Sequence, residues 1–374
     1  MPDPIVPKAL APGATIAFIS PSLRLNDLLP GVMVRATDVL SGRGCKVRTF
    51  FNKDTTIQAS ISNRLSEIRA AFADPTISAI ITTIGGSTFT ELLPALIADT
   101  ELHRTIRANP KIVVGYSDIT GLHWFLYAMT GLRTFYGPGP IPELGEASSV
   151  DDEASPLAFC VKHLFRAIEE PKPLGGVPRS LTYAAELASS LLETDSAKPP
   201  KTRPNPGWEW LRGGKSEGRL FGGCLTVVAR LHAIQPVVPD WKGRIVFLET
   251  AIGEDDVSGN PIYRVQAGFA DLIAAGVFEE AAGLVVGRPF GYNSDEQRKE
   301  YTDVIKGLLC EGRLADNKFP ILFGVDFGHT TPMVTLPFDA LARLDSENDR
   351  FEILEAAVAQ IDDHRLDGVQ TEMM

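Results

Sequence analysis

Strand-like and helix-like patterns of apolar residues alternate along the N-terminal third of the chain. Runs typical of buried strands lie at residues 14–20, 45–50, 77–84 and 111–115. Between them, apolar residues recur at the spacing of one helix face, which predicts helices at 31–43, 61–73, 89–98 and 119–130. This alternation predicts an α/β fold in which a parallel sheet carries helices on both faces.

The pattern changes after residue 137, where Gly-Pro-Gly-Pro-Ile-Pro interrupts any regular element. Residues 171–218 are rich in Pro, Gly, Ser and Lys, with one helix-like stretch at 183–193. Strand-like and helix-like runs then resume, with strands predicted at 243–250 and 282–287 and helices at 262–275 and 296–311. We therefore predict an N-terminal domain (1–170), an irregular connection (171–204) and a C-terminal domain (205–374).

Composition narrows the class of protein. The 374 residues are 44% hydrophobic and 22% charged, as in globular proteins with two domains. No apolar run approaches the roughly 18 residues of a membrane span, and no secretory signal precedes the first strand. The net charge of −11 argues against a nucleic-acid partner. Sparse cysteine favours a reducing compartment, so we expect a cytoplasmic protein that binds neither membrane nor nucleic acid.

Motifs for metals and cofactors do not occur in the sequence. The four cysteines form no C-x-x-C pair, and the six histidines form no H-E-x-x-H motif. Neither G-x-G-x-x-G nor a P-loop is present. We therefore expect no metal and no cofactor.

Residues 115–120 (Gly-Tyr-Ser-Asp-Ile-Thr) connect a predicted strand to a predicted helix. This is the layout of a nucleophile elbow, which presents a serine hydroxyl at the carboxyl edge of a parallel sheet. The free N–H groups of the helix start could hold an oxyanion there. Ile119 replaces the usual second glycine, and helix capping by Ser117 or Asp118 is the simpler interpretation of the pattern alone.

Three further segments could take part in binding or catalysis, although each also has an ordinary structural explanation. Gly85 and Gly86 follow a buried strand and could approach a ligand closely, or could simply form a turn capped by Ser87. Glu249 ends an apolar strand, where it could orient an imidazole or form a surface ion pair. His329 lies in a loop between Gly and Thr, where it could act as a base or bond to backbone.

Trp208 lies near the irregular connection, together with Trp210 and several basic residues. These side chains could stack on a polar ligand or pin the loop to the protein body, and the sequence favours neither.

The ordered succession of these motifs resembles the LD-carboxypeptidase family of serine peptidases, which includes muramoyltetrapeptide carboxypeptidases and microcin C immunity-type peptidases. The resemblance covers most of the chain. It rests on the opening strand, on Thr-Ile-Gly-Gly at 83–86, on the elbow, and on the segments at 130–138, 218–225, 245–249, 263–264, 328–329 and 335–337. The family implies a flavodoxin-like N-terminal domain, a smaller β-rich C-terminal domain, a homodimer and no metal.

By this resemblance, Ser117 is the nucleophile, His329 its base and Glu249 the orienting carboxylate. The backbone N–H groups of Gly86 and Asp118 would form the oxyanion hole. Further substrate contacts are expected from Gly85, Ser87, Tyr183, Trp208, Tyr263 and Arg264.

The predicted function is therefore a serine carboxypeptidase-type hydrolase that cleaves an amide bond in a small peptide or peptide conjugate. An alternative is a hydrolase of peptidyl- or aminoacyl-nucleotides, as in the microcin-immunity branch. Two positions depart from that branch: Tyr183 stands near where a stacking Trp is usual, and Cys224 where Asn is usual. An alternative of another class is a non-enzymatic protein that binds a small molecule between two lobes.

Overall fold

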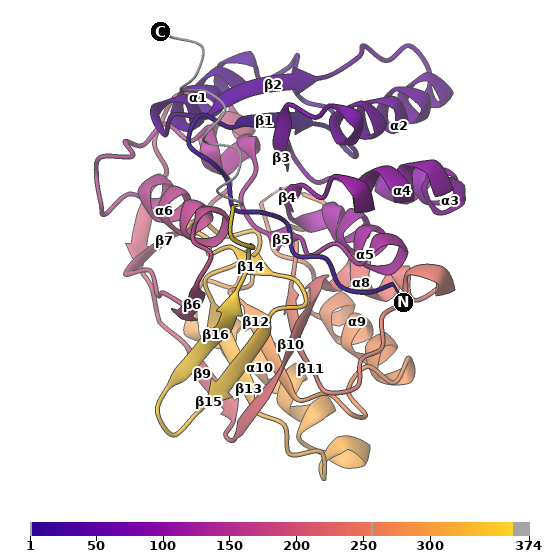
Figure 1. Ribbon diagram of the computed structural model, residues 1–374. Coiled ribbons are helices and arrows are strands. Elements are labelled where there is room, and N and C mark those ends of the chain that lie inside the picture. Colours follow the sequence, from indigo (N-terminus) through magenta and orange to yellow (C-terminus); the bar gives the residue numbers. More distant parts are fainter. Residues whose placement is uncertain (1, 256, 362–374) are drawn as a thin grey trace, which may run out of the picture.

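A computed structural model describes residues 2–255 and 257–361, which form two large sheets, one beside the other, and a small two-stranded sheet (Figure 1). The first sheet has strand order β14-β5-β4-β3-β1-β2. Its five consecutive parallel strands follow the order 2-1-3-4-5 of flavodoxin-like folds, and β14 pairs antiparallel at one edge. Their bounds are β1 (Thr15–Ile19), β2 (Lys46–Phe50), β3 (Ile77–Thr82), β4 (Ile112–Gly115), β5 (Phe135–Tyr136) and β14 (Leu336–Pro337).

Helices cover both faces of this sheet, as the sequence predicts. Figure 1 shows α2 to α5 on one side and α1 with α6 on the other. The helices bury their apolar stripes against strands that are themselves nearly continuous apolar runs. Their bounds are α1 (Pro30–Gly42), α2 (Ile57–Ala73), α3 (Leu93–Ala98), α4 (Thr100–Ala108), α5 (Thr120–Thr130) and α6 (Pro156–Glu169).

The second sheet is mixed, with strand order β6-β16-β15-β10-β11-β12-β13-β9. Strands β10 to β13 are parallel, and the flanking strands pair antiparallel. The strands are β6 (Pro173–Gly176), β9 (Glu209–Arg212), β10 (Lys215–Cys224), β11 (Arg244–Glu249), β12 (Gly283–Gly287), β13 (Ile321–Val325), β15 (Leu341–Asp345) and β16 (Arg350–Ala356). Helices α8 (Leu225–Leu231), α9 (Ile262–Ala274) and α10 (Asp295–Leu309) accompany it. The α/β fold with a β-rich C-terminal sheet is thus confirmed.

The segment between the two sheets is more ordered than its composition suggests. It contributes β6 to the second sheet and a hairpin of β7 (Thr182–Ala184) and β8 (Thr202–Pro204). The helix predicted at 183–193 is wrong for most of its length, because only α7 (Ser189–Leu192) is helical. Backbone pairing with Thr331 draws Ala184 into an extended conformation instead.

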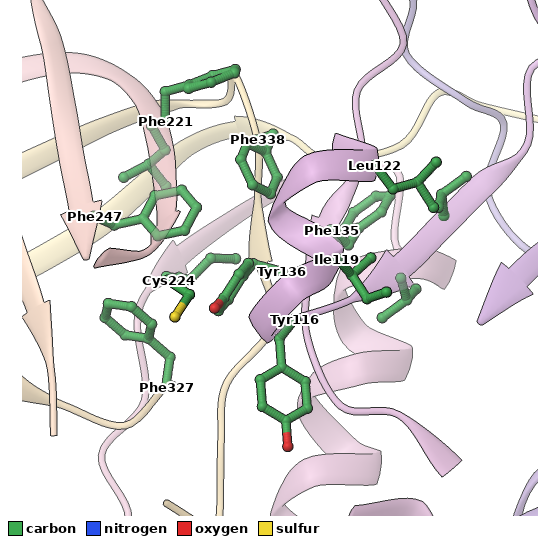
Figure 2. Packing of buried hydrophobic residues seen from close by; sticks show 14 of the residues in the cluster. Tyr116, Ile119, Leu122, Phe135, Tyr136, Phe221, Cys224, Phe247, Phe327 and Phe338 are labelled. Atoms are coloured by element: carbon green, nitrogen blue, oxygen red, sulfur yellow. The ribbon is translucent and has the colours of Figure 1, made fainter. Parts of the chain in front are cut away.

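The two sheets meet through a shared aromatic layer. Figure 2 shows the ring of Tyr136 from the first sheet beside Phe247, Phe327 and Phe338, all of which are buried. The indole of Trp124 on α5 donates a 2.9 Å hydrogen bond to the carbonyl of Gly222 on β10. This contact fixes α5, the helix that follows Ser117, against the C-terminal sheet.

Among the described residues, no helix is both long and apolar enough to cross a membrane. Within the same residues, no cluster of three or more His, Cys, Asp or Glu side chains could hold a metal ion.

A buried ion pair also lies where the two sheets meet. Asp339, which follows β14, accepts a 2.9 Å hydrogen bond from Arg244 on β11, and Arg244 also donates to the hydroxyl of Tyr127 on α5. Both charged side chains are less than 10% exposed. Removing one partner would leave the other charge buried without compensation.

We predict that Asp339→Asn lowers the free energy of unfolding by about 3 kcal/mol, because Arg244 then keeps its buried charge without a counter-ion. Asparagine is chosen because it tolerates the positive φ of 55° at this position. Denaturant unfolding of this variant would be compared with Asp303→Asn, which removes an exposed ion pair with Lys299 and should change stability by less than about 1 kcal/mol. Equal stabilities of the two variants would contradict the prediction.

Candidate active site

Ser117 occupies a sharp turn between β4 and α5. Its φ is +64°, a conformation that is uncommon for a residue other than glycine and that marks a nucleophile elbow. The Thr120 hydroxyl donates a 2.7 Å hydrogen bond to the Ser117 carbonyl and accepts another from the N–H of Cys224 on β10. The strained turn is therefore held by α5 of the N-terminal domain and, through Thr120, by β10 of the C-terminal sheet.

Neither Ser117 nor Asp118 caps α5. No side-chain cap hydrogen bond is present at the start of that helix or of the 3-10 turn before it. The Asp118 carboxylate instead accepts from the Ser22 hydroxyl, from the N–H of Phe89 and from Arg230. It thereby ties the elbow to the segment after β3, and the capping interpretation of the sequence pattern is wrong.

Ser117, His329 and Glu249 form one line of hydrogen bonds. The Ser117 hydroxyl lies 2.9 Å from Nε2 of His329, and Nδ1 of His329 lies 2.7 Å from Oε2 of Glu249. Glu249 ends β11 with its side chain fully buried, whereas Ser117 is 9% exposed. A buried carboxylate, an imidazole and a hydroxyl in this order are the arrangement that activates serine in hydrolases.

The loop before His329 permits the close approach to Glu249. Gly328 has a φ of +101°, and a Cβ atom at this position would lie 2.6 Å from Oε2 of Glu249. Only glycine can therefore bring the backbone this near to the carboxylate.

The charges around His329 favour the protonated form of its imidazole. Burial lowers the pKa of His329, but the charge of Glu249, its hydrogen bond and the more distant Glu143 raise it, and the net pKa lies above 6.5. The imidazolium that forms when His329 takes up a proton is thus stabilised.

Two residues next to this line are not among those predicted from the sequence. Tyr136, on β5, donates a 2.5 Å hydrogen bond from its hydroxyl to Oε1 of Glu249 and accepts a 3.1 Å bond from the N–H of Ser117. Glu143 accepts a 2.6 Å bond from Tyr116, whose ring packs edge-on against His329. Both lie in or next to the Gly-Pro-rich stretch, where no periodic pattern marks a buried polar group.

The turn after β3 contacts the elbow. A Cβ atom on Gly85 would lie 2.6 Å from Cβ of Ser117 and 3.2 Å from the backbone nitrogen of Asp118. Gly86 has a φ of +137°, which favours glycine. Gly85 therefore packs against the elbow, and Gly86 lines the same cavity as Ser117.

A cavity of about 280 Å³ opens at Ser117 and His329. Residues 186–188 and Leu191 of the connection cover one side of it. Its charged side chains are the carboxylates of Glu143 and Glu186, beside the imidazole of His329. The rest of the wall is largely apolar and includes Leu23, Ile84, Pro142, Leu187, Ala188, Leu191, Ala251 and Ile252.

Gly85 and Gly86 line this cavity, but the structure places the other expected binding residues elsewhere. Tyr183 is 3% exposed, and the Arg288 guanidinium covers its ring at 4.5 Å. Trp208 is covered by Arg179 at 3.9 Å, which agrees with the interpretation that it pins the loop.

The remaining three expected contacts lie on the surface. Tyr263 is 65% exposed, Arg264 pairs with Glu254 at 2.6 Å, and Ser87 is exposed beside the glycine turn. None of these three side chains lines the cavity at Ser117.

Comparison with known proteins agrees with this architecture. Residues 16–137 match the LD-carboxypeptidase N-terminal domain, and residues 217–344 match the LD-carboxypeptidase C-terminal domain. The chain belongs to the LD-carboxypeptidase family. A Vibrio cholerae protein with a provisional carboxypeptidase name is 31% identical over 92% of this chain and 96% of its own length.

Two further relatives in this serine peptidase family carry different functional names. The microcin C7 self-immunity protein MccF of Escherichia coli is 29% identical over 94% of this chain and 96% of its own length. A Bacillus subtilis protein with a provisional name as a murein peptide carboxypeptidase is 26% identical over 95% of both chains.

Solved structures of LD-carboxypeptidase relatives superpose over nearly the whole chain. MccF in complex with glutamyl sulfamoyl guanosine is 26% identical with a TM-score of 0.78, covering 95% of this chain and all of that one. Another MccF structure holds aspartyl sulfamoyl adenosine. An MccF-like protein from Bacillus anthracis is 26% identical with a TM-score of 0.79, covering 94% of this chain and 99% of its own.

Proposed function

We propose that the protein is a serine carboxypeptidase-type hydrolase that cleaves an amide bond in a small peptide or peptide conjugate. The observation that carries this proposal is the continuous line of hydrogen bonds from the Ser117 hydroxyl through His329 to Glu249. A protein that only bound a small molecule would have no need of this line at the mouth of its cavity.

In the proposed mechanism, the Ser117 oxygen attacks the amide carbonyl while Nε2 of His329 takes the hydroxyl proton. The N–H groups of Gly86 and Asp118 stabilise the resulting oxyanion. The tetrahedral intermediate collapses as His329 returns the proton to the leaving amine. Water, deprotonated by His329, then attacks the acyl-enzyme and releases Ser117. Glu249 stabilises the imidazolium in both half-reactions.

The cavity argues for a substrate without a negative charge near the scissile amide. Glu143 and Glu186 would repel an anionic acyl group. An ammonium group could pair with the exposed Glu186, whereas both oxygens of Glu143 already accept bonds from Tyr116 and Gly139. The apolar part of the wall would accept the aliphatic stem of such a side chain. We therefore propose a cationic or neutral acyl residue.

Hydrolysis of aminoacyl-nucleotides is the second candidate, because MccF structures hold aminoacyl sulfamoyl nucleosides. The cavity offers little surface for nucleobase stacking: Tyr116 contributes an aromatic ring, whereas Tyr183 is buried beneath Arg288. A peptide-type substrate is therefore favoured.

The expected homodimer and the cytoplasmic location remain predictions.

We predict that Ser117→Ala lowers amide hydrolysis by roughly 10⁶-fold and abolishes labelling by an alkyl fluorophosphonate, because no hydroxyl remains to attack. The matched control is Ser66→Ala, which removes an exposed hydroxyl on α2 and should retain both. Mass spectrometry of the labelled protein and thermal unfolding would accompany the assay. Wild-type turnover by a folded Ser117→Ala enzyme would refute the proposed nucleophile.

A second prediction concerns the acyl residue. With the same leaving group, a lysyl substrate should exceed a glutamyl substrate in kcat/KM by at least about tenfold, a difference of about 1.4 kcal/mol. Glu143→Gln should reduce this ratio, whereas Glu254→Gln, which changes an exposed carboxylate outside the cavity, should leave it unchanged. A preference for the glutamyl substrate would mean that the two cavity carboxylates do not select the acyl group.

A further inference from the structure

The Tyr136 hydroxyl forms hydrogen bonds to Glu249 and to the backbone of Ser117, the first and last residues of the hydrogen-bonded line, but not to His329 between them. It donates a 2.5 Å bond to Oε1 of Glu249, while the other oxygen of that carboxylate accepts from His329. It also accepts a 3.1 Å bond from the N–H of Ser117. A phenol offers one donor and lone pairs as acceptors, so these two bonds are compatible with a single hydroxyl orientation.

The sheet register explains why this residue reaches both partners. On β5, Tyr136 pairs with Gly115 of β4, two residues before Ser117. On its other side it pairs with Leu336 of β14, a strand that follows the His329 loop. One residue is thus fixed in register to the elbow strand and to the segment that carries the imidazole.

Aromatic packing restricts the Tyr136 ring. Figure 2 shows it enclosed by Phe247, Phe327 and Phe338, and its ring centroid lies 5.5, 6.4 and 6.3 Å from theirs in edge-on geometry. Its side chain is fully buried. Burial, and then the negative charge of Glu249, raise the pKa of the Tyr136 phenol, so the hydroxyl keeps its proton and remains a donor.

We propose that Tyr136 is a positioning residue that sets the orientation of the Glu249 carboxylate and of the Ser117 elbow relative to each other. This inference rests on the proposed function. Without the hydroxyl, Oε1 of Glu249 and the N–H of Ser117 would both lose a buried partner. The carboxylate would then keep only its bond to His329 and lose the bond that sets its orientation relative to the elbow, and the elbow would lose a bond that holds its positive φ.

The test measures the rate at which an alkyl fluorophosphonate labels the full-length protein at different pH values. In this reaction the Ser117 oxygen bonds to phosphorus, fluoride leaves, and the serine proton passes to His329. The rate therefore falls at acidic pH, when His329 is already protonated. Labelling depends on the hydrogen-bonded line but not on knowing the natural substrate.

For Tyr136→Phe we expect the labelling rate to fall by at least about tenfold, because small displacements of reacting groups slow reactions strongly. The acid limb should also move to higher pH. Loss of a donor leaves more of the negative charge of Glu249 directed at His329, which stabilises the protonated form of the imidazole. A purely structural role of the hydroxyl would lower the amount of active protein without moving this limb.

The matched control is Tyr127→Phe, which removes another buried hydroxyl, bonded to Arg244 and Asp339 away from the cavity. It should keep the wild-type rate and acid limb. A second variant tests the same idea without removing the hydroxyl: 3-fluorotyrosine at position 136 is a stronger donor and should move the acid limb to lower pH.

The outcomes separate the two claims. If the wild-type protein takes up no label at Ser117, the proposed function fails, and this inference fails with it. If the wild-type protein is labelled but neither Tyr136 variant moves the acid limb, the inference fails and the proposed function stands.

Discussion

Everything around the site depends on one buried carboxylate placed where the two sheets meet. Glu249 ends a central strand of the C-terminal sheet, with no exposed surface, and both of its oxygens accept hydrogen bonds. One bond comes from the His329 imidazole and the other from Tyr136 of the N-terminal sheet. A charge at this depth requires such partners, because its desolvation is otherwise costly. The position of each partner is therefore constrained by the need to satisfy Glu249.

Hydrogen bonds likewise hold Ser117 in its strained backbone conformation. A positive φ at a non-glycine residue typically costs about 1–3 kcal/mol and persists only when the surroundings hold it. Around Ser117, the Tyr136 hydroxyl accepts from the N–H and the Thr120 hydroxyl donates to the carbonyl. The carboxylate of the following residue, Asp118, accepts from the N–H of Phe89 in the segment after β3. Cys224 of β10 in turn donates to the Thr120 hydroxyl, so the elbow is supported from both sheets.

Much of this arrangement could be predicted from the sequence, for identifiable reasons. Parallel strands have long apolar runs and place their carboxyl ends at one edge, so the sequence alone points to Ser117 and to the Gly85–Gly86 turn. Glu249 and His329 required the family resemblance, because a strand-end Glu or a loop His alone is more often structural. Tyr136 and Glu143 were missed because hydrogen bonds between distant segments leave no local periodicity. Tyr183 was misplaced because its sequence neighbours do not reveal that Arg288 covers it.

The most direct measurement of the central claim is a ¹⁵N NMR titration of the His329 imidazole in the wild-type protein and in Glu249→Gln. Glu249 stabilises the imidazolium, so the wild-type pKa should lie above 6.5, and the amide variant should bring it down as the negative charge is lost. A His329 that titrates below 6.5 in the wild type, or whose pKa is the same in both proteins, would contradict the account.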